Sequence, residues 1–250
     1  MTRLIETLIS GLSLGSIYAL MALGYTMVYG IAKMLNFAHG DIIMVGAYAV
    51  VTSVLTLGMP PLVAILISIA VCALLGITVE FLAYRPLRQA PPLAVLITAI
   101  GVSYLLQQVA QLSWSSNPKS FTSVVSGMKP VSLFGGQLTI SAETIVTIVA
   151  CVVIMVVLMW FVNYTPAGHA MLAVSEDRGA AQLMGVNVNG TISLTFAIGS
   201  ALAAIAGALL CSSYPTLQPT TGAMPGIKAF VAAVFGGIRS EEHTSELQSH

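Results

Sequence analysis

The chain has 250 residues, of which 57% are hydrophobic and only 7% charged, with nine basic and nine acidic side chains. An ordinary soluble domain carries about 25% charged residues, so this composition excludes a soluble protein of the same length, and the mean hydropathy of +0.93 predicts an integral membrane protein. The apolar residues form continuous runs, not the alternating pattern of a membrane β-barrel. The expected fold class is therefore all-α, a polytopic bundle of transmembrane helices.

Six apolar runs are close to the length of one membrane crossing, about 20 residues, and a seventh is incomplete. Pro61 and Pro92 open the third and fourth runs, and proline suits the first turn of a helix. The sequence predicts about six full spans and an incomplete seventh, at residues 8–31, 41–57, 61–82, 92–114, 141–162, 190–212 and 226–238.

The segment LNFAHGD separates the first two runs and concentrates polar groups between them. Transporter sites often lie where a helix is interrupted, because unwound backbone and helix ends can face a polar solute there. Gly40 would allow a backbone conformation that a β-carbon resists. On this interpretation the translocation path includes Asn36, Phe37, His39, Gly40 and Asp41. The alternative is a short hairpin loop at the membrane surface, with solvated polar groups and with His39 and Asp41 capping helices.

The first long connection, residues 115–140, carries a hairpin signal. Two glycines separate Val131–Phe134 from Gln137–Ile140, a pattern typical of a tight β-hairpin. We expect a small cap outside the membrane.

The second long connection follows the fifth run and contains a short amphipathic pattern. Ser175 is expected to cap a helix whose first turn carries Glu176 and Asp177, the favourable charge at that end. Gly185 is expected to end it. An apolar patch that includes Leu183 would then face outward and meet a protein or the lipid interface.

Catalytic and metal-binding motifs are missing from the sequence. It contains no H-E-x-x-H, no G-x-S-x-G and no nucleotide-binding G-x-x-x-x-G-K-[ST]. Cys72, Cys151 and Cys211 each lie inside an apolar run and indicate neither disulfides nor a metal site. We expect no catalytic residues, no metal, no cofactor and no nucleic-acid partner.

A self-sufficient secondary transporter or channel for a small polar solute is the alternative function. Proton coupling requires ionisable groups within the bilayer, and the carboxylates beside the runs are Asp41, Glu80 and Glu143, all near run ends. A transporter driven by a separate ATPase needs only a path and a docking element.

Four stretches, in order, resemble the inner-membrane permease subunits of bacterial high-affinity branched-chain amino acid ABC transporters. They are LNFAHGDIIMVGAYAV, GHAMLAVSEDRGAAQLMGVNV, ISLTFAIGSALAAIAGALL and GIKAFVAAVFGGI, and the resemblance covers residues 1–238. It implies a multi-pass permease subunit, itself no enzyme, of a binding-protein-dependent importer for branched-chain or related amino acids. The implied partners are a homologous permease, two cytoplasmic ATPases, a periplasmic substrate-binding protein and membrane lipid.

The resemblance also implies a cytoplasmic loop after the fifth run that contacts an ATPase. The residues assigned to this coupling are Gly168, Ser175, Glu176, Asp177, Arg178, Leu183 and Gly185. Leu172 stands where relatives often carry an arginine, so we expect no basic contact there.

Charge alone leaves the orientation open, since four basic residues fall on each side of the membrane. The resemblance places the N-terminus outside. The two sets are Lys33, Arg85, Arg88 and Arg178 on one side, and Arg3, Lys119, Lys129 and Lys228 on the other.

The last twelve residues, RSEEHTSELQSH, differ abruptly in composition from the rest and resemble a translated sequencing adapter. Relatives continue with further hydrophobic spans after FGGI. We therefore expect a transmembrane permease domain at 1–238, truncated at its C-terminus, and an artefactual tail at 239–250.

Overall fold

A computed structural model of the chain describes residues 2–120, 131–133 and 138–238. It confirms the all-α class. The helices are α1 (Thr2–Ala32), α2 (His39–Leu55), α3 (Pro61–Val79), α4 (Pro92–Trp114), α5 (Ala142–Tyr164), α6 (Pro166–Glu176), α7 (Arg178–Leu183), α8 (Val188–Ser213) and α9 (Ala223–Ala233). A π-helix (Glu80–Tyr84) and a 3-10 turn (Arg85–Leu87) extend α3, and a second π-helix (Val234–Ile238) extends α9.

Two short antiparallel strand pairs lie outside the helices. β2 (Val131–Leu133) pairs with β3 (Leu138–Ile140), which confirms the predicted hairpin, although its turn at 134–137 lies outside the described residues. β1 (Lys119–Ser120) pairs with β4 (Thr216–Leu217) and joins the loops that follow α4 and α8.

Five of the described helical segments are long and apolar enough to cross a membrane: α1, α3 with its extension, α4, α5 and α8. The expected second span, residues 41–57, forms the 17-residue helix α2, which is about 26 Å long at 1.5 Å per residue. This is less than the hydrocarbon thickness of about 30 Å. α9 is shorter still, with 11 residues.

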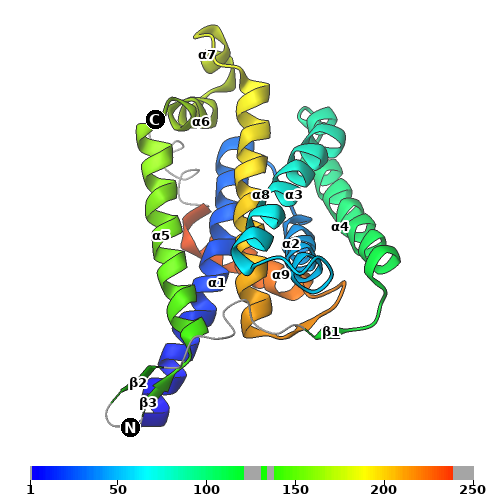
Figure 1. Cartoon of the computed structure of the whole chain (residues 1–250). Coiled ribbons are helices and arrows are strands. Elements are labelled where there is room, and N and C mark those ends of the chain that lie inside the picture. The colour runs from blue at the N-terminus through cyan, green and yellow to red at the C-terminus, as the bar shows by residue number, and fades with distance from the viewer. Residues whose placement is uncertain (1, 121–130, 134–137, 239–250) are drawn as a thin grey trace.

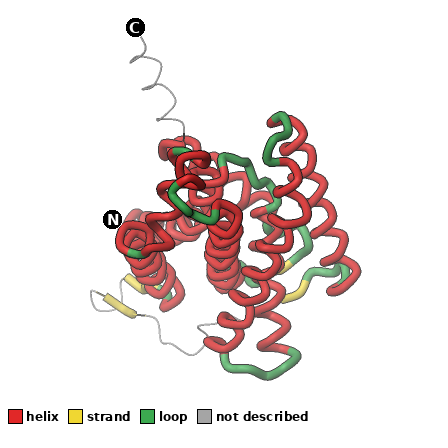
Figure 2. Tube along the Cα trace, turned by 90° about the horizontal axis from the view of Figure 1, so that it is seen from above, coloured by secondary structure: helices red, strands yellow, loops and turns green. Residues whose placement is uncertain are grey.

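Helix α8 forms the centre of the bundle (Figure 1), and Figure 2 shows the bundle of helices from above. In the most apolar 18-residue stretch of α8, 72% of the residues are buried. The corresponding share is 11–28% in the other four long helices, which present most of their surface outward. Small residues allow its neighbours to approach closely: a β-carbon at Gly207 would lie 2.4 Å from the carbonyl oxygen of Ile43 on α2. Likewise, a β-carbon on Gly46 of α2 would lie 2.7 Å from Ala204 Cα on α8.

The two short helices α2 and α9 begin side by side. A β-carbon at Gly222, which precedes α9, would lie 1.8 Å from the carbonyl oxygen of Gly40, and one at Gly226 would lie 2.8 Å from Gly40 Cα. The sequence suggested that Gly40 adopts a special backbone conformation, but its φ is not positive. Gly40 is required instead because two backbones approach closely there. Glycine contacts therefore hold the N-terminal ends of both helices together.

One basic residue, Lys228, lies away from both ends of the bundle. Lys228 lies on α9, with its ammonium group 5.9 Å from the ring centroid of Tyr18, midway along α1. Because Lys228 is not at an end, the positive-inside rule now favours a cytoplasmic location for the end that carries α6 and α7. That end holds Lys33, Arg85, Arg88 and Arg178, whereas the opposite end holds Arg3 and Lys119, with Lys129 outside the described residues.

Replacing Gly222 by alanine is expected to destabilise the protein, because the added methyl group would collide with the Gly40 carbonyl. Overpacking of this kind costs about 1–3 kcal/mol, and each kcal/mol lowers the unfolding midpoint by about 2–4 °C in a chain of this size. Thermal unfolding of the detergent-purified protein measures the effect. The control is Gly101→Ala on α4, where a β-carbon meets nothing within 4 Å. Equal midpoints for the two variants would contradict the packing described.

Candidate functional site

The segment between α1 and α2 folds back into the bundle. Lys33, with a φ of 50°, ends α1 in the left-handed region, and α2 begins at His39. The His39 ring lies 4.5 Å from the Tyr25 ring, centroid to centroid. It also packs against Gly24, where a β-carbon would lie 2.5 Å from His39 Nε2. The start of α2 is therefore level with the interior of α1 and not with its end.

The polar side chains of this segment are buried: Asn36 is 4% exposed, and His39 and Asp41 are 1% exposed. Asn36 Oδ1 accepts a hydrogen bond from the Tyr84 hydroxyl at 2.9 Å, and Asp41 Oδ1 accepts one from Gln107 Nε2 at 2.9 Å. His39 Nε2 has no hydrogen-bond partner among the described residues. The alternative of a solvated loop at the membrane surface is wrong, because tertiary contacts shield all three groups from water.

A cavity of about 330 Å³ lies beside this segment. We call it the polar cavity. Of the five residues expected to form a path, Phe37, Gly40 and Asp41 line it, whereas Asn36 and His39 do not. The complete lining is Tyr25, Phe37, Gly40, Asp41, Ile100, Ser103, Tyr104, Gln107, Ala223, Gly226 and Ile227.

The polar cavity combines groups of opposite electrostatic character. Asp41 supplies a carboxylate, supported by Gln107, whose amide also donates to Ser103 Oγ at 3.4 Å. The first turns of α2 and α9 reach the same cavity, and the N-terminal end of a helix carries a partial positive charge. This arrangement suits a small solute with both a cationic and an anionic group.

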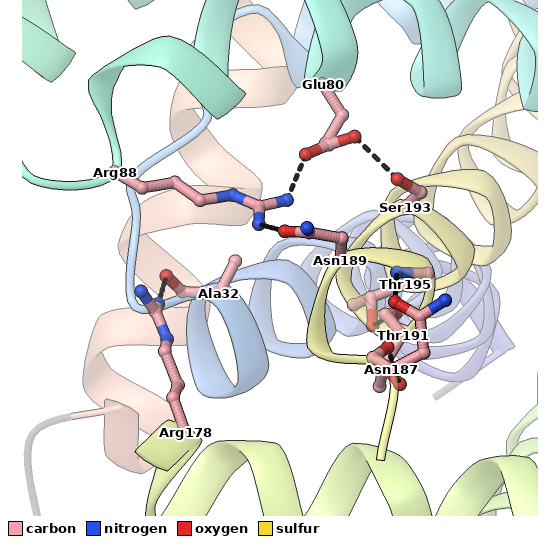
Figure 3. A network of polar contacts seen from close by, with 10 residues as sticks. Ala32, Glu80, Arg88, Arg178, Asn187, Asn189, Thr191, Ser193 and Thr195 are labelled. Carbon is pink, nitrogen blue, oxygen red and sulfur yellow. Dashed lines mark hydrogen bonds and ion pairs between the residues drawn. The ribbon is translucent and has the colours of Figure 1, made fainter. Parts of the chain in front are cut away.

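A buried polar network joins the end of α3 to the start of α8 (Figure 3). Glu80, which is 0% exposed, forms an ion pair with Arg88 and accepts a hydrogen bond from Ser193 Oγ at 2.6 Å. Arg88 also donates to Asn189 Oδ1. The carboxylate is thus fully engaged, although the sequence suggested only that it lay near a run end.

Arg178 connects α7 to the end of α1. Its guanidinium group donates to the carbonyl oxygen of Ala32 (Figure 3), one of the last carbonyls of α1, which lack partners within the helix. Burial, and secondarily the nearby charge of Arg88, lower the pKa of Arg178. Arg178 therefore faces the bundle, unlike the neighbouring Glu176 and Asp177, which are exposed.

The predicted helix capped by Ser175 is wrong. Thr165 caps an earlier helix, α6, by accepting a hydrogen bond from Gly168 N at 3.0 Å, and α6 continues through Glu176. Asp177 then caps α7, because its Oδ1 accepts from Gly179 N at 2.7 Å and from the next amide at 3.1 Å. Ser175 instead donates within α6, to the carbonyl oxygen of Leu172.

The end of α7 confirms the role expected for Gly185. Its φ is 86°, its amide donates to the Gln182 carbonyl at 3.0 Å, and the following amide donates to the Ala181 carbonyl at 3.0 Å. This is a Schellman motif. Leu183 and Met184 are 89% and 84% exposed, so the predicted apolar patch faces outward.

Gly168 is buried and has a packing role. A β-carbon there would lie 2.2 Å from the Val162 carbonyl oxygen, so the glycine lets α6 turn tightly against the end of α5. Figure 1 shows α6 and α7 together at one end of the bundle.

Several site residues were not found by sequence reasoning. Ser103 and Gln107 carry a local signal, since they are spaced i, i+4 on one face of an otherwise apolar run. No local sequence signal links Tyr84 to Asn36 or the Glu80–Arg88 pair to α8, because these contacts join residues far apart in the chain.

Comparison with known proteins gives a consistent set of relatives. A family model described as "Branched-chain amino acid transport system / permease component" matches residues 7–243. The high-affinity branched-chain amino acid transport permease protein BraD of Pseudomonas aeruginosa is 41% identical over 94% of this chain and 80% of its own length. LivH of Escherichia coli, with the same description, is 39% identical with the same coverage. No solved structure gives a significant match.

Replacing Arg88 by methionine is expected to destabilise the bundle strongly, because it leaves the buried Glu80 carboxylate without its cation. Losing one partner of a buried ion pair costs about 3–5 kcal/mol. The matched control is Arg85→Met, which removes an exposed cation that lies over the Phe81 ring. Thermal unfolding in detergent compares the two, and a smaller loss for Arg88→Met than for Arg85→Met would show that the network contributes little.

Proposed function

Because the chain belongs to the branched-chain amino acid transport permease family, we propose that it lets branched-chain or related amino acids cross the membrane as one subunit of an importer. The chain is a transport component and not an enzyme, and it is a multi-pass protein of the inner membrane. The alternative of a self-sufficient secondary transporter or channel is not favoured. Of the carboxylates considered for coupling, Glu80 forms a buried ion pair with Arg88, and Glu143 lies in the first turn of α5.

The translocation path on this proposal runs past the polar cavity and the segment Asn36–Asp41. The observation that carries it is the meeting of two helix N-termini, on α2 and α9, with the Asp41 carboxylate in one cavity. An amino acid carries an ammonium and a carboxylate group, and the cavity offers a charge of opposite sign to each. Ile100 and Ile227 provide apolar surface for a branched side chain. Asn36 and His39, which do not line the cavity, would support the path through their contacts with Tyr84 and Tyr25.

Lys228 supports a polar environment along α9. Its side chain is exposed, yet it lies beside Tyr18 at the middle of α1. A charged side chain at such a depth is costly in lipid and is usually found facing a water-filled path or a protein partner. On our proposal this face meets the homologous permease subunit across the path.

Members of such importers work with an ATPase and a binding protein. We assign the ATPase contact to α6 and α7, because an exposed apolar patch there is flanked by exposed acidic residues. The contact residues on this proposal are Ser175, Glu176, Asp177, Leu183 and Gly185. Gly168 and Arg178 would serve the coupling by holding α6 against α5 and α7 against α1. Two ATPases and a second permease would complete the assembly, with the periplasmic binding protein on the opposite face. The division of the chain at residue 238 stays a prediction.

Replacing Asp41 by asparagine tests the path. The amide oxygen can still accept from Gln107, so the packing is kept while the charge is removed. A charged hydrogen bond to the substrate contributes about 1.5–3 kcal/mol, so uptake of a branched-chain amino acid by the assembled importer should fall about tenfold or more. Glu143→Gln, a carboxylate at the start of α5 that does not line the polar cavity, is the control. Full uptake by Asp41→Asn would remove Asp41 from the path.

Reversing one charge tests the ATPase contact. Glu176→Lys leaves the α7 cap intact, because the cap is Asp177, and Asp177→Asn keeps an acceptor while removing the second charge. With both changes, substrate-stimulated ATP hydrolysis and uptake should fall together, while the amount of chain in the membrane stays constant. Glu6→Lys, near the opposite end of α1, is the control. Unchanged coupling would place the ATPase contact elsewhere.

A further inference from the structure

A second cavity, of about 540 Å³, lies at the end of the bundle that carries α7, and three cations line it. Lys33 comes from the α1–α2 junction, Arg88 from the α3–α4 turn and Arg178 from α7. We call it the cationic cavity. None of the described residues that line it is acidic, and the neighbouring Glu80 neutralises only Arg88. Two positive charges are therefore left without a counter-charge.

The donors of these cations are incompletely used. Arg88 Nε is buried and has no hydrogen-bond partner in the part of the chain that the structure describes. The Lys33 ammonium makes no ion pair or hydrogen bond with any described residue. Arg178 makes one bond, to the Ala32 carbonyl, out of the five that a guanidinium can donate. A cavity with several free N–H donors and an excess of positive charge favours an anion.

The start of α4 adds to this preference. Ala90 and Pro92 line the cationic cavity, and Pro92 is the first residue of the helix. Pro91 and Pro92 have no amide hydrogen, so this helix end contributes only its partial positive charge, which favours an anion.

The remaining wall is apolar and lies where the long helix α1 ends and the long helix α4 begins. Leu87, Val95 and Leu96 form it together with Met34. An anion that binds here would therefore have a charged group beside the three cations and an apolar portion along α4. Basic pockets between transmembrane helices at this level are suited to the headgroups of acidic lipids.

We propose that the cationic cavity binds a phosphate group, supplied by an anionic phospholipid whose acyl chains lie along α4. A free phosphate-containing solute shares the same chemistry and would occupy the same donors, without using the apolar wall. The site is distinct from the polar cavity, and the proposal does not depend on the translocation path.

The test uses the importer complex purified with this chain, stripped of lipid in detergent and titrated with phosphatidylglycerol, phosphatidylcholine or inorganic phosphate. The unmodified complex should bind phosphatidylglycerol and discriminate against zwitterionic phosphatidylcholine. Lys33→Gln and Arg178→Gln should each weaken phosphatidylglycerol binding about fivefold. In the double variant the two factors should multiply. Arg178→Lys, which keeps the charge, should retain most of the affinity.

Arg85→Gln is the matched control, because Arg85 is an exposed cation at the same end that does not line the cavity. Its phosphatidylglycerol affinity should equal that of the unmodified complex. If inorganic phosphate binds with the same dependence on Lys33 and Arg178 and phosphatidylglycerol does not, the site exists but its ligand is a free anion. The proposal is overturned if Lys33→Gln and Arg178→Gln bind phosphatidylglycerol and phosphate as tightly as the unmodified complex does. It is also overturned if Arg85→Gln loses as much affinity as these two variants, which would indicate general attraction to the charged surface. Lys33 is exposed, so Lys33→Gln keeps the test valid if Arg178→Gln unfolds.

Discussion

The close approach of α8 to its neighbours is the contact on which the rest of the molecule depends. In lipid, helices associate through tight packing and buried polar contacts, not by burial of apolar surface. Gly207 and Gly46 let α8 and α2 touch backbone to backbone, and Gly76 of α3 leaves no room for a β-carbon beside Ser200. Once α8 fixes α2 within the bundle, the segment before α2 must enter the interior.

That placement explains the burial of polar groups around Asn36 and Asp41. Hydrocarbon offers no hydrogen-bond partners, so Asn36 and Asp41 gain stability from partners within the protein. Tyr84 and Gln107 provide them from other helices. The polar cavity differs from this packed interior, because the first turns of α2 and α9 line a space of about 330 Å³ beside Asp41.

The proposed path and the proposed ATPase contact share one rigid element. The first turns of α8 hold Asn189 and Ser193 of the buried network near α7, and its later turns hold α2 through Gly207. Movement of α6 and α7 would therefore act on the helix that positions the polar cavity. The cationic cavity is lined by Arg88 of this network and by Arg178 of α7.

The sequence by itself determined the features that depend on composition and local chemistry. Low charge and continuous apolar runs determined a helical membrane protein. Pro61 and Pro92 determined where two helices begin, and Gly185 where one ends, because these residues act through their own backbone. Four ordered motifs indicated the family.

Only the tertiary structure decided how the site is built. Asn36 and Asp41 are paired with residues 48 and 66 positions away, contacts that no local pattern specifies. The choice of Asp177 over Ser175 as a cap was also tertiary in origin: both side chains suit a helix start, but Gly168 packs α6 against the end of α5, and Arg178 anchors α7 to α1. The depth of Lys228 was decided in the same way, because the glycine contact that sets where α9 begins lies between segments far apart in the chain.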